Sequence, residues 1–224
     1  MGEWIELKAA DGHTFAAWRA KPTGAPKGAI VVVQEVFGVN SHIREVADGF
    51  AADGYLAIAP ALFDRAERGV ELGYDGADMD KARSLMRAVP TDQALADTQA
   101  AVNEAAAGGK VGVVGYCWGG TLAWLAATRL SGVAAAVGYY GGGVADARDE
   151  QPGCPVMLHF GALDSGIPLE GVRQVAAAHP HVPVHIYDKA GHGFGCDHRA
   201  SYHAESAALA RQRTVAFFDE TLSV

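Results

Sequence analysis

The sequence predicts an α/β fold in which helices cover both faces of a mostly parallel central sheet. Short runs rich in valine, isoleucine and alanine alternate along the chain with longer segments of helical character. Several of the short runs are continuously apolar, which is typical of strands that are buried on both faces. The chain has 224 residues, of which 50% are hydrophobic. This is enough for one sizeable core, so we expect a single domain over residues 1–224.

The expected elements begin with a hairpin and continue as alternating strands and helices. Ile5–Lys8 and Thr14–Arg19 flank the turn Asp11-Gly12 and form the hairpin. The other expected strands are Ala29–Gln34, Tyr55–Ala59, Val111–Gly115, Val133–Tyr139, Val156–Phe160 and Val184–Tyr187. The expected helices are His42–Asp53, Thr91–Ala107, Gly119–Leu130, Leu169–Ala178 and Ala204–Leu222. Thr91 is a candidate N-cap, and Gly54 fits the glycine position that follows a helix.

Composition and charge narrow the classes of function. The formal net charge of -8 argues against nucleic-acid binding, because a phosphate-binding surface needs clustered Lys and Arg. No apolar run reaches the ~18 residues of a membrane span, and the charged start of the chain lacks the apolar core of a secretion signal. Three cysteines without a framework spacing are typical of a reducing compartment. We therefore expect a soluble cytoplasmic protein that is a monomer or a small homo-oligomer.

The most informative motif follows the expected strand Val111–Gly115. Residues 115–120 read Gly-Tyr-Cys-Trp-Gly-Gly, which is the strand–turn–helix pattern of a nucleophile elbow with cysteine in place of the usual serine. Side chains at positions 115 and 119 would collide with a neighbouring strand or helix, so the turn needs glycine there. The helix N-terminus also favours the thiolate form of Cys117. Cys117 is therefore the candidate nucleophile of an α/β-hydrolase.

Two candidate partners of Cys117 follow later strands, in the chain order that this fold requires: nucleophile, acid, then histidine. Asp164 follows Val156–Phe160, and His192 follows Val184–Tyr187. Because the carboxyl ends of parallel strands meet at one edge of a sheet, we expect all three side chains to lie together. His192 would act as the base, and Asp164 would orient its ring. Alone, either residue would be interpreted as part of a turn or loop.

Two other classes of protein remain open at this stage. His192, Cys196, Asp197, His198 and His203 crowd one short segment, so a metal-binding or redox-sensing protein is the first alternative. Their spacing matches none of the established zinc patterns, and we expect neither a metal nor a cofactor. The second alternative is a hydrolase fold that only binds a ligand, against which the intact set of three catalytic residue types argues.

The sequence resembles the dienelactone hydrolase, or carboxymethylenebutenolidase, family over nearly its whole length. Besides the cysteine elbow, the matching segments are Gln34–Asn40, Ala59–Phe63, Gly138–Gly141, Phe160–Asp164, Gly191–Phe194 and the pattern from Tyr202 to Phe218. The resemblance implies a hydrolase of esters or lactones with the triad Cys117, His192 and Asp164. It also implies that Glu35 lies near Cys117 and controls its ionisation, since a carboxylate beside a thiolate favours the neutral thiol. From the residues alone, Glu35 could instead cap a turn or pair with Arg44.

The resemblance is incomplete at the positions that bind substrate. Family members that cleave dienelactones carry an arginine four residues after the catalytic histidine, where this chain has Cys196. Their second arginine falls near Met79, in a gapped part of the comparison. Lys81, Arg83 and Arg199 are candidate replacements that would hold a substrate carboxylate. The resemblance therefore carries over the hydrolytic core but not the dienelactone substrate.

The expected reaction also needs an oxyanion hole and a pocket. Backbone N–H groups of Trp118, after the nucleophile, and Val36, after the first buried strand, would bind the oxyanion. Trp118, Phe37, Phe63 and Tyr140 are candidate walls of a partly aromatic pocket. The expected partner is a small-molecule ester or lactone.

Overall fold

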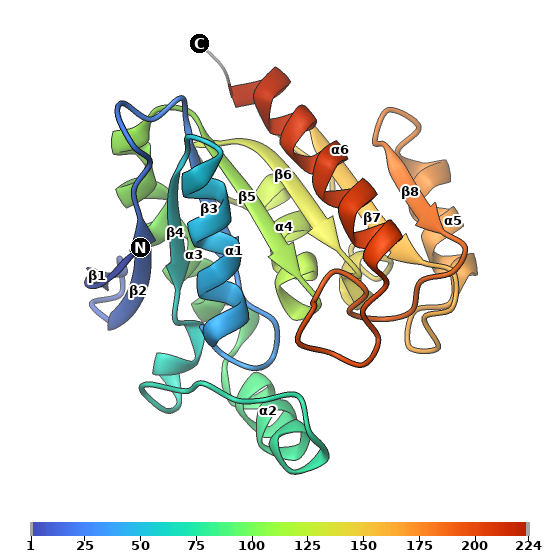
Figure 1. Cartoon of the computed structure of the whole chain (residues 1–224), viewed down its shortest axis with the longest axis horizontal. Coiled ribbons are helices and arrows are strands. Elements are labelled where there is room, and N and C mark those ends of the chain that lie inside the picture. Colours follow the sequence, from blue (N-terminus) through green and yellow to red (C-terminus); the bar gives the residue numbers. More distant parts are fainter. Residues whose placement is uncertain (1, 223–224) are drawn as a thin grey trace.

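The computed structural model describes residues 2–222, and these form one eight-stranded sheet with helices on both faces (Figure 1). The strands are β1 Glu3–Lys8, β2 Thr14–Ala20, β3 Ala29–Val33, β4 Leu56–Pro60, β5 Val111–Tyr116, β6 Val133–Tyr139, β7 Val156–Gly161 and β8 Val184–Tyr187. The α-helices are α1 Ser41–Ala52, α2 Gly76–Ala88, α3 Thr91–Ala105, α4 Trp118–Arg129, α5 Leu169–Ala178 and α6 Ala204–Leu222. Short 3-10 turns are η1 Leu62–Arg65, η2 Ala106–Gly108 and η3 Gly142–Val144.

The sheet is parallel over most of its width. Its strand order is β1-β2-β4-β3-β5-β6-β7-β8, and all neighbours from β4 to β8 pair in parallel. β1 and β2 form an antiparallel hairpin, and β2 joins β4 antiparallel. The predicted hairpin and mostly parallel sheet are therefore confirmed. β3 and β5 are buried along their whole length, which explains their continuously apolar sequences.

The helices form two layers, one on each face of the sheet. In Figure 1, α1 and α6 lie in front of the sheet, and α3 and α4 lie behind it. Phe50 of α1 meets Phe218 of α6 with ring centroids 6.1 Å apart, and both side chains are fully buried. α4 buries Leu122, Trp124 and Leu125 among others. This packing fixes the helices against the strands and so fixes the loops at the carboxyl ends of the strands.

The structure contains one α-helix that the sequence analysis did not predict. α2 buries only Ala82 and Leu85, and a helix with so narrow an apolar face has a weak periodic pattern. Its N-cap is Asp75, whose side chain accepts a hydrogen bond from the N–H of Asp78 at 3.0 Å. α2 lies beyond the lower edge of the sheet in Figure 1, where the arrowheads of β5 and β6 point.

The prediction that Thr91 is an N-cap is wrong. Pro90 is the N-cap of α3, with a ψ of 145°, and its carbonyl accepts from the N–H of Ala94 at 3.0 Å. Thr91 is already helical, because the fixed φ of proline suits the cap and leaves the next residue free to begin the helix. The role of Gly54 is confirmed: it follows the C-cap Asp53 with a φ of 97°.

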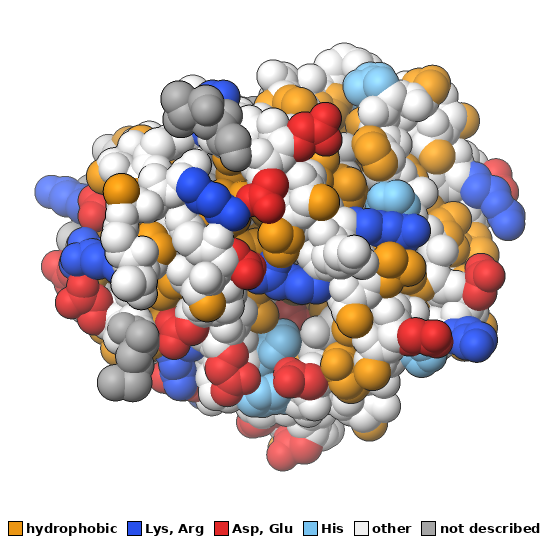
Figure 2. All heavy atoms as spheres, turned by 45° about the horizontal axis from the view of Figure 1, so that its top comes forward, with side chains coloured by type: hydrophobic (Ala, Val, Ile, Leu, Met, Phe, Trp, Pro, Cys, Tyr) orange, Lys and Arg blue, Asp and Glu red, His pale blue; other side chains and the backbone are white. Residues whose placement is uncertain are grey.

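None of the helices within residues 2–222 combines the length and apolarity that a membrane crossing requires. Acidic and basic side chains are interspersed over the face of the molecule in Figure 2. A hollow near the lower centre of that face exposes histidine and acidic side chains.

Candidate active site

Cys117 lies on the sharp turn between β5 and α4. Its backbone has a φ of 56° and a ψ of -116°, a conformation that residues other than glycine rarely adopt. Its N–H donates to the carbonyl of Tyr139 on the neighbouring β6 at 3.0 Å, and its carbonyl accepts from the N–H of Gly120 at 2.9 Å. These hydrogen bonds hold the strained turn that presents the thiol, as expected of a nucleophile elbow.

The glycines of the elbow let α4 pass very close to the strands. A Cβ on Gly115 would lie 1.8 Å from the carbonyl oxygen of Gly119, and a Cβ on Gly119 would lie 2.4 Å from the carbonyl oxygen of Val33. Both contacts are with backbone, so a side chain at either position would push α4 away from β5 or β3. The predicted need for glycine at positions 115 and 119 is therefore confirmed.

Asp164 and His192 lie at the same edge of the sheet as the elbow. The Nδ1 atom of His192 is 2.7 Å from Oδ2 of Asp164, and Oδ1 of Asp164 accepts from the N–H of Gly166 at 2.9 Å. His192 and Cys117 line the same cavity, and the thiol contributes to the raised pKa of His192. The structure therefore brings the three predicted side chains together in the sequence thiol, imidazole, carboxylate.

The surroundings favour a charged imidazole at this site. Burial alone would lower the pKa of His192, but hydrogen bonds to Asp164 and Cys117 outweigh it and raise the pKa to about 10. Burial would likewise raise the pKa of Asp164, yet the hydrogen bond and charge of His192, with backbone N–H groups, lower that pKa below its ordinary value. At neutral pH these shifts hold His192 as an imidazolium and Asp164 as a carboxylate.

A cavity of about 430 Å³ opens beside Cys117 and His192. Its walls are mainly apolar: Met86 comes from α2, Trp118 from α4 and Ile167 from the loop after Asp164. The volume and lining suit a small, largely apolar ester or lactone. The contributions of Met86 and Ile167 were not foreseen, and the wall from α2 depends on a helix that the sequence analysis missed.

Three of the predicted aromatic walls lie behind this lining. Phe63 stacks on Trp118 with ring centroids 5.5 Å apart, while Phe37 and Tyr140 are 1% and 0% exposed. The ring of Tyr140 lies 5.1 Å from that of His192. Phe63 and Tyr140 thus pack against residues that line the cavity, whereas Phe37 packs against Tyr74 and Arg199. Only Trp118, of the predicted walls, lines the cavity.

The predicted oxyanion donors lie where β3 meets the start of α4. Trp118 is the first residue of α4, so no carbonyl within the helix is available to its N–H. A Cβ on Gly119 would lie within 2.5 Å of the carbonyl oxygens of Val33 and Gln34, which shows how closely α4 approaches the segment leading to Val36. The two predicted oxyanion donors, the N–H groups of Trp118 and Val36, therefore belong to neighbouring segments at the start of α4 and after β3.

Glu35 is fully buried and pairs with Arg199. The Nη1 atom of Arg199 donates to Oε1 of Glu35 at 3.0 Å, and the hydroxyl of Tyr74 donates to Oε2 at 3.1 Å. The alternative partner, Arg44, forms an ion pair with Glu71 instead. Tyr74 was not foreseen, because its loop lies 39 residues from Glu35 in the chain.

Arg199 approaches the backbone beside His192. A Cβ on Gly193 would lie 2.6 Å from Nη1 of Arg199, and Gly193 has a φ of 73°. The side chain of Arg199 is 15% exposed, and its charge interacts with both Glu35 and Cys117. The structure thus brings this candidate arginine to the site.

Arg199 itself is not among the residues that line the cavity, and the other candidate cations also lie outside its wall. Arg83 is 60% exposed on α2 and pairs with Asp80 at 3.9 Å. Lys81 pairs with Glu67 at 2.7 Å. Cys196, at the position of the family arginine, is buried and does not line the cavity either.

The strand order, the two helical layers and the strained strand–helix elbow define an α/β-hydrolase. The family model for the dienelactone hydrolase family matches residues 15–222. The chain belongs to the dienelactone hydrolase family and is a carboxylic ester hydrolase.

Individual relatives agree with this assignment. A carboxymethylenebutenolidase of Pseudomonas putida is 36% identical over 227 residues, which cover 97% of this chain and 96% of the relative. The crystal structure of a provisionally named dienelactone hydrolase from Klebsiella pneumoniae is 34% identical, with a TM-score of 0.84 and coverage of 97% of this chain and 99% of that chain. An esterase of Pyrococcus furiosus, only 14% identical, shares the fold with a TM-score of 0.72 over 100% of this chain and 94% of its own.

Proposed function

We propose that the protein hydrolyses a small ester or enol-lactone through a thioester acyl-enzyme on Cys117. The observation that carries this proposal is the strained elbow, which presents Cys117 to the cavity beside His192, itself 2.7 Å from the buried Asp164. Turnover of a p-nitrophenyl ester by the purified protein tests it. The name of the Pseudomonas putida relative, carboxymethylenebutenolidase, supports an enol-lactone as the natural class of substrate.

In the proposed reaction, the Cys117 thiolate attacks the substrate carbonyl carbon and breaks the ester C–O bond. The N–H groups of Trp118 and Val36 stabilise the tetrahedral oxyanion, each by roughly 3–4 kcal/mol. His192 donates its proton to the leaving alkoxide, then accepts a proton from the water that hydrolyses the thioester. Asp164 keeps the ring of His192 in the required tautomer and stabilises its charged form.

We propose that Arg199 holds a carboxylate on the substrate. It replaces the family arginine that is missing at Cys196, and Gly193 lets it lie against the backbone beside the catalytic histidine. A substrate carboxylate on Arg199 would compete with Glu35 for the same guanidinium. Arg83 does not fit this role, because it is exposed away from the cavity.

Replacing Arg199 by glutamine should raise KM for an ester that carries a carboxylate by about tenfold or more. KM for the matched neutral ester should change much less, because only the first substrate loses an ion pair. The Arg199→Lys variant keeps the charge but not the bidentate geometry, and it serves as the control. Its KM for the carboxylate ester should lie between the values for wild type and Arg199→Gln. Equal effects of Arg199→Gln on both esters would contradict the assignment.

We also propose that Glu35 restrains the reactivity of Cys117 in the resting enzyme. The Glu35 carboxylate neutralises Arg199, whose charge otherwise acts on the thiol. A substrate carboxylate on Arg199 neutralises that charge as Glu35 does, so binding would relieve the restraint by displacing the Glu35 carboxylate away from the thiol.

The Glu35→Gln variant should react faster with iodoacetamide at neutral pH and turn over esters more slowly. Faster labelling follows because the unneutralised Arg199 favours the thiolate, and slower turnover follows because binding no longer triggers activation. The measurement is the alkylation rate against pH for wild type and variant. Superimposable curves would rule out this role for Glu35 and would leave the assignment of the triad unaffected.

We place the protein in the cytoplasm, as a monomer or small homo-oligomer. All three cysteines are free thiols, and the proposed nucleophile requires a reduced one.

A further inference from the structure

A cluster of four side chains lies outside the proposed catalytic site, where α1 meets the loop between β8 and α6. His42 and Glu45 are one turn apart on α1, and Asp197 and His198 are consecutive in the loop. Each offers one nitrogen or oxygen atom, and these atoms all lie within 4.8 Å of one another. The sequence analysis singled out Asp197 and His198, but no sequence pattern connects them with His42 and Glu45 on α1.

The separations in this cluster are those of ligands around one small cation. Nε2 of His198 is 2.9 Å from Oε2 of Glu45 and 3.8 Å from Oδ1 of Asp197, while Nδ1 of His42 is 3.4 Å from that same Oδ1. Tetrahedral zinc with bonds of 2.0–2.1 Å places its ligand atoms about 3.3 Å apart. The two imidazole rings, with centroids 5.4 Å apart and planes tilted by 57°, already converge on one region.

The charges around the cluster are unbalanced. Within residues 2–222, Glu45 and Asp197 form ion pairs only with His42 and His198. Arg199 pairs with Glu35, and Nη2 of Arg211 pairs with Asp53. Arg211 lines the same pocket as the cluster, and its Nη1 atom has no hydrogen-bond partner among the described residues. With neutral imidazoles, a ring N–H of His198 can donate to Glu45 at 2.9 Å, but the cluster still carries the two negative charges of its carboxylates. A divalent cation would supply the missing positive charge.

His42 also has the surroundings of a metal-binding histidine. Its side chain is 5% exposed, and its Nε2 atom has no hydrogen-bond partner among the described residues. Glu35 and Cys196 each place an atom within 4.8 Å of a ring nitrogen of His42. In metal-binding histidines the second nitrogen commonly donates to a carboxylate, and Glu35 is the carboxylate near His42 on the side away from solvent.

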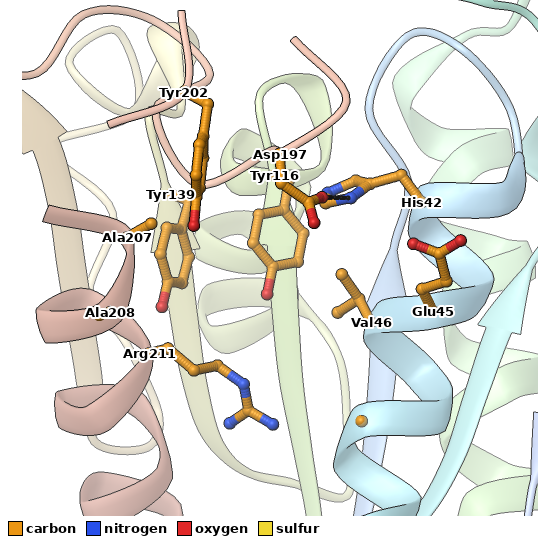
Figure 3. Close-up of a pocket in the computed structure, with 12 residues that line it drawn as sticks. His42, Glu45, Val46, Tyr116, Tyr139, Asp197, Tyr202, Ala207, Ala208 and Arg211 are labelled. Atoms are coloured by element: carbon orange, nitrogen blue, oxygen red, sulfur yellow. Dashed lines mark ion pairs between the residues drawn. The ribbon is translucent and has the colours of Figure 1, made fainter. Parts of the chain in front are cut away.

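The cluster is open to solvent through a pocket of about 330 Å³ between α1 and α6. Figure 3 shows the His42 ring and the Asp197 carboxylate pointing toward one another at the top of this pocket, with Glu45 reaching up from α1. An ion could therefore enter without any displacement of the main chain.

We propose that His42, Glu45, Asp197 and His198 bind a divalent transition-metal ion of the Zn²⁺ type. Two imidazoles with two carboxylates suit Zn²⁺, Co²⁺ or Ni²⁺, whereas Mg²⁺ and Ca²⁺ prefer ligand sets made of oxygen alone. The ion would fix the loop that carries Arg199 to α1. The site is separate from the proposed triad and does not depend on it.

The test uses the Cys117→Ala protein, because the catalytic thiol and His192 would otherwise bind metal as well. After removal of adventitious metal with a chelator and dialysis, Co²⁺ is titrated and its visible absorption recorded, followed by displacement with Zn²⁺. We expect one ion per chain with submillimolar affinity, no thiolate-to-cobalt charge-transfer band, and a rise in Tm on addition of Zn²⁺.

Two variants in this background locate the site. His198→Ala should weaken binding by at least about tenfold and remove the rise in Tm. His181→Ala, which removes an exposed histidine distant in sequence from the cluster, should change neither. Absence of binding, or equal affinity in the His198→Ala protein, would overturn the proposal. A thiolate charge-transfer band would also overturn it, because it would place the ion on Cys196 with Glu35 and His42.

Discussion

The Cys117→Ala variant is expected to lose ester hydrolysis down to the background rate while keeping its fold. The thiolate forms the covalent bond to the acyl group, and no other group in the proposed mechanism can replace it. Truncation removes only one sulfur atom, from a side chain that is partly exposed at the cavity, so the thermal midpoint should change little. Turnover of p-nitrophenyl acetate and a thermal melt measure the two expectations.

Cys154 provides the matched control for this prediction. Burial raises the pKa of its thiol to about 11, so it is a poor nucleophile at neutral pH. Cys154→Ala should keep wild-type turnover, and iodoacetamide should inactivate the wild-type protein by labelling one site. Cys117→Ser should leave little activity, because a hydroxyl needs much stronger base assistance than a thiol. Wild-type turnover by the Cys117→Ala protein would refute the mechanism.

The Asp164→Asn variant should fold normally but lose kcat by several orders of magnitude. In a triad, exchanging the carboxylate for an amide costs up to about 10⁴-fold, because the histidine is no longer held in its working tautomer. The change should be large here, since the Asp164 side chain is 1% exposed and lies 2.7 Å from Nδ1 of His192. Water cannot replace the buried oxygen.

Asp188 is the control for this second prediction, because it follows β8 in the chain as Asp164 follows β7, but it is exposed. Asp188→Asn should leave kcat within about twofold of wild type, as is usual for surface substitutions away from a site. Should the Asp188 variant lose activity and the Asp164 variant retain it, the acid of the triad would have to be reassigned.

The elbow was predictable from sequence because its constraints are local. Gly115 is required by a backbone contact with Gly119 in the same strand–helix unit, and Gly119 is required by the close approach of α4 to β3. The Gly-x-Cys-x-Gly spacing indicates both requirements. The positions of Asp164 and His192 followed from a rule of topology, since each comes after a strand of a parallel sheet. α2 was missed for the opposite reason: with only Ala82 and Leu85 buried, its position is fixed by the surrounding loops and not by its own pattern.

The other features that the sequence did not predict depend on contacts between loops that are distant in the chain. Arg199 and Glu35 are 164 residues apart, and their pairing depends on the path of the loop after His192. That path is possible because Gly193 lacks a side chain, a reason that cannot be read from the isolated glycine. The cluster of His42, Glu45, Asp197 and His198 likewise joins two segments of the chain that only the fold brings together.

The most direct test of the central claim is to trap the acyl-enzyme. The wild-type protein is mixed with p-nitrophenyl acetate, quenched with acid within the first turnovers, digested and analysed by mass spectrometry. The proposed mechanism predicts one acetyl group on the peptide that contains Cys117, removable by hydroxylamine, and no acetyl group on that peptide in the Cys117→Ala protein. A burst of p-nitrophenol with the acetyl group on another residue, or with no acylated peptide, would contradict the assignment of Cys117 as the nucleophile.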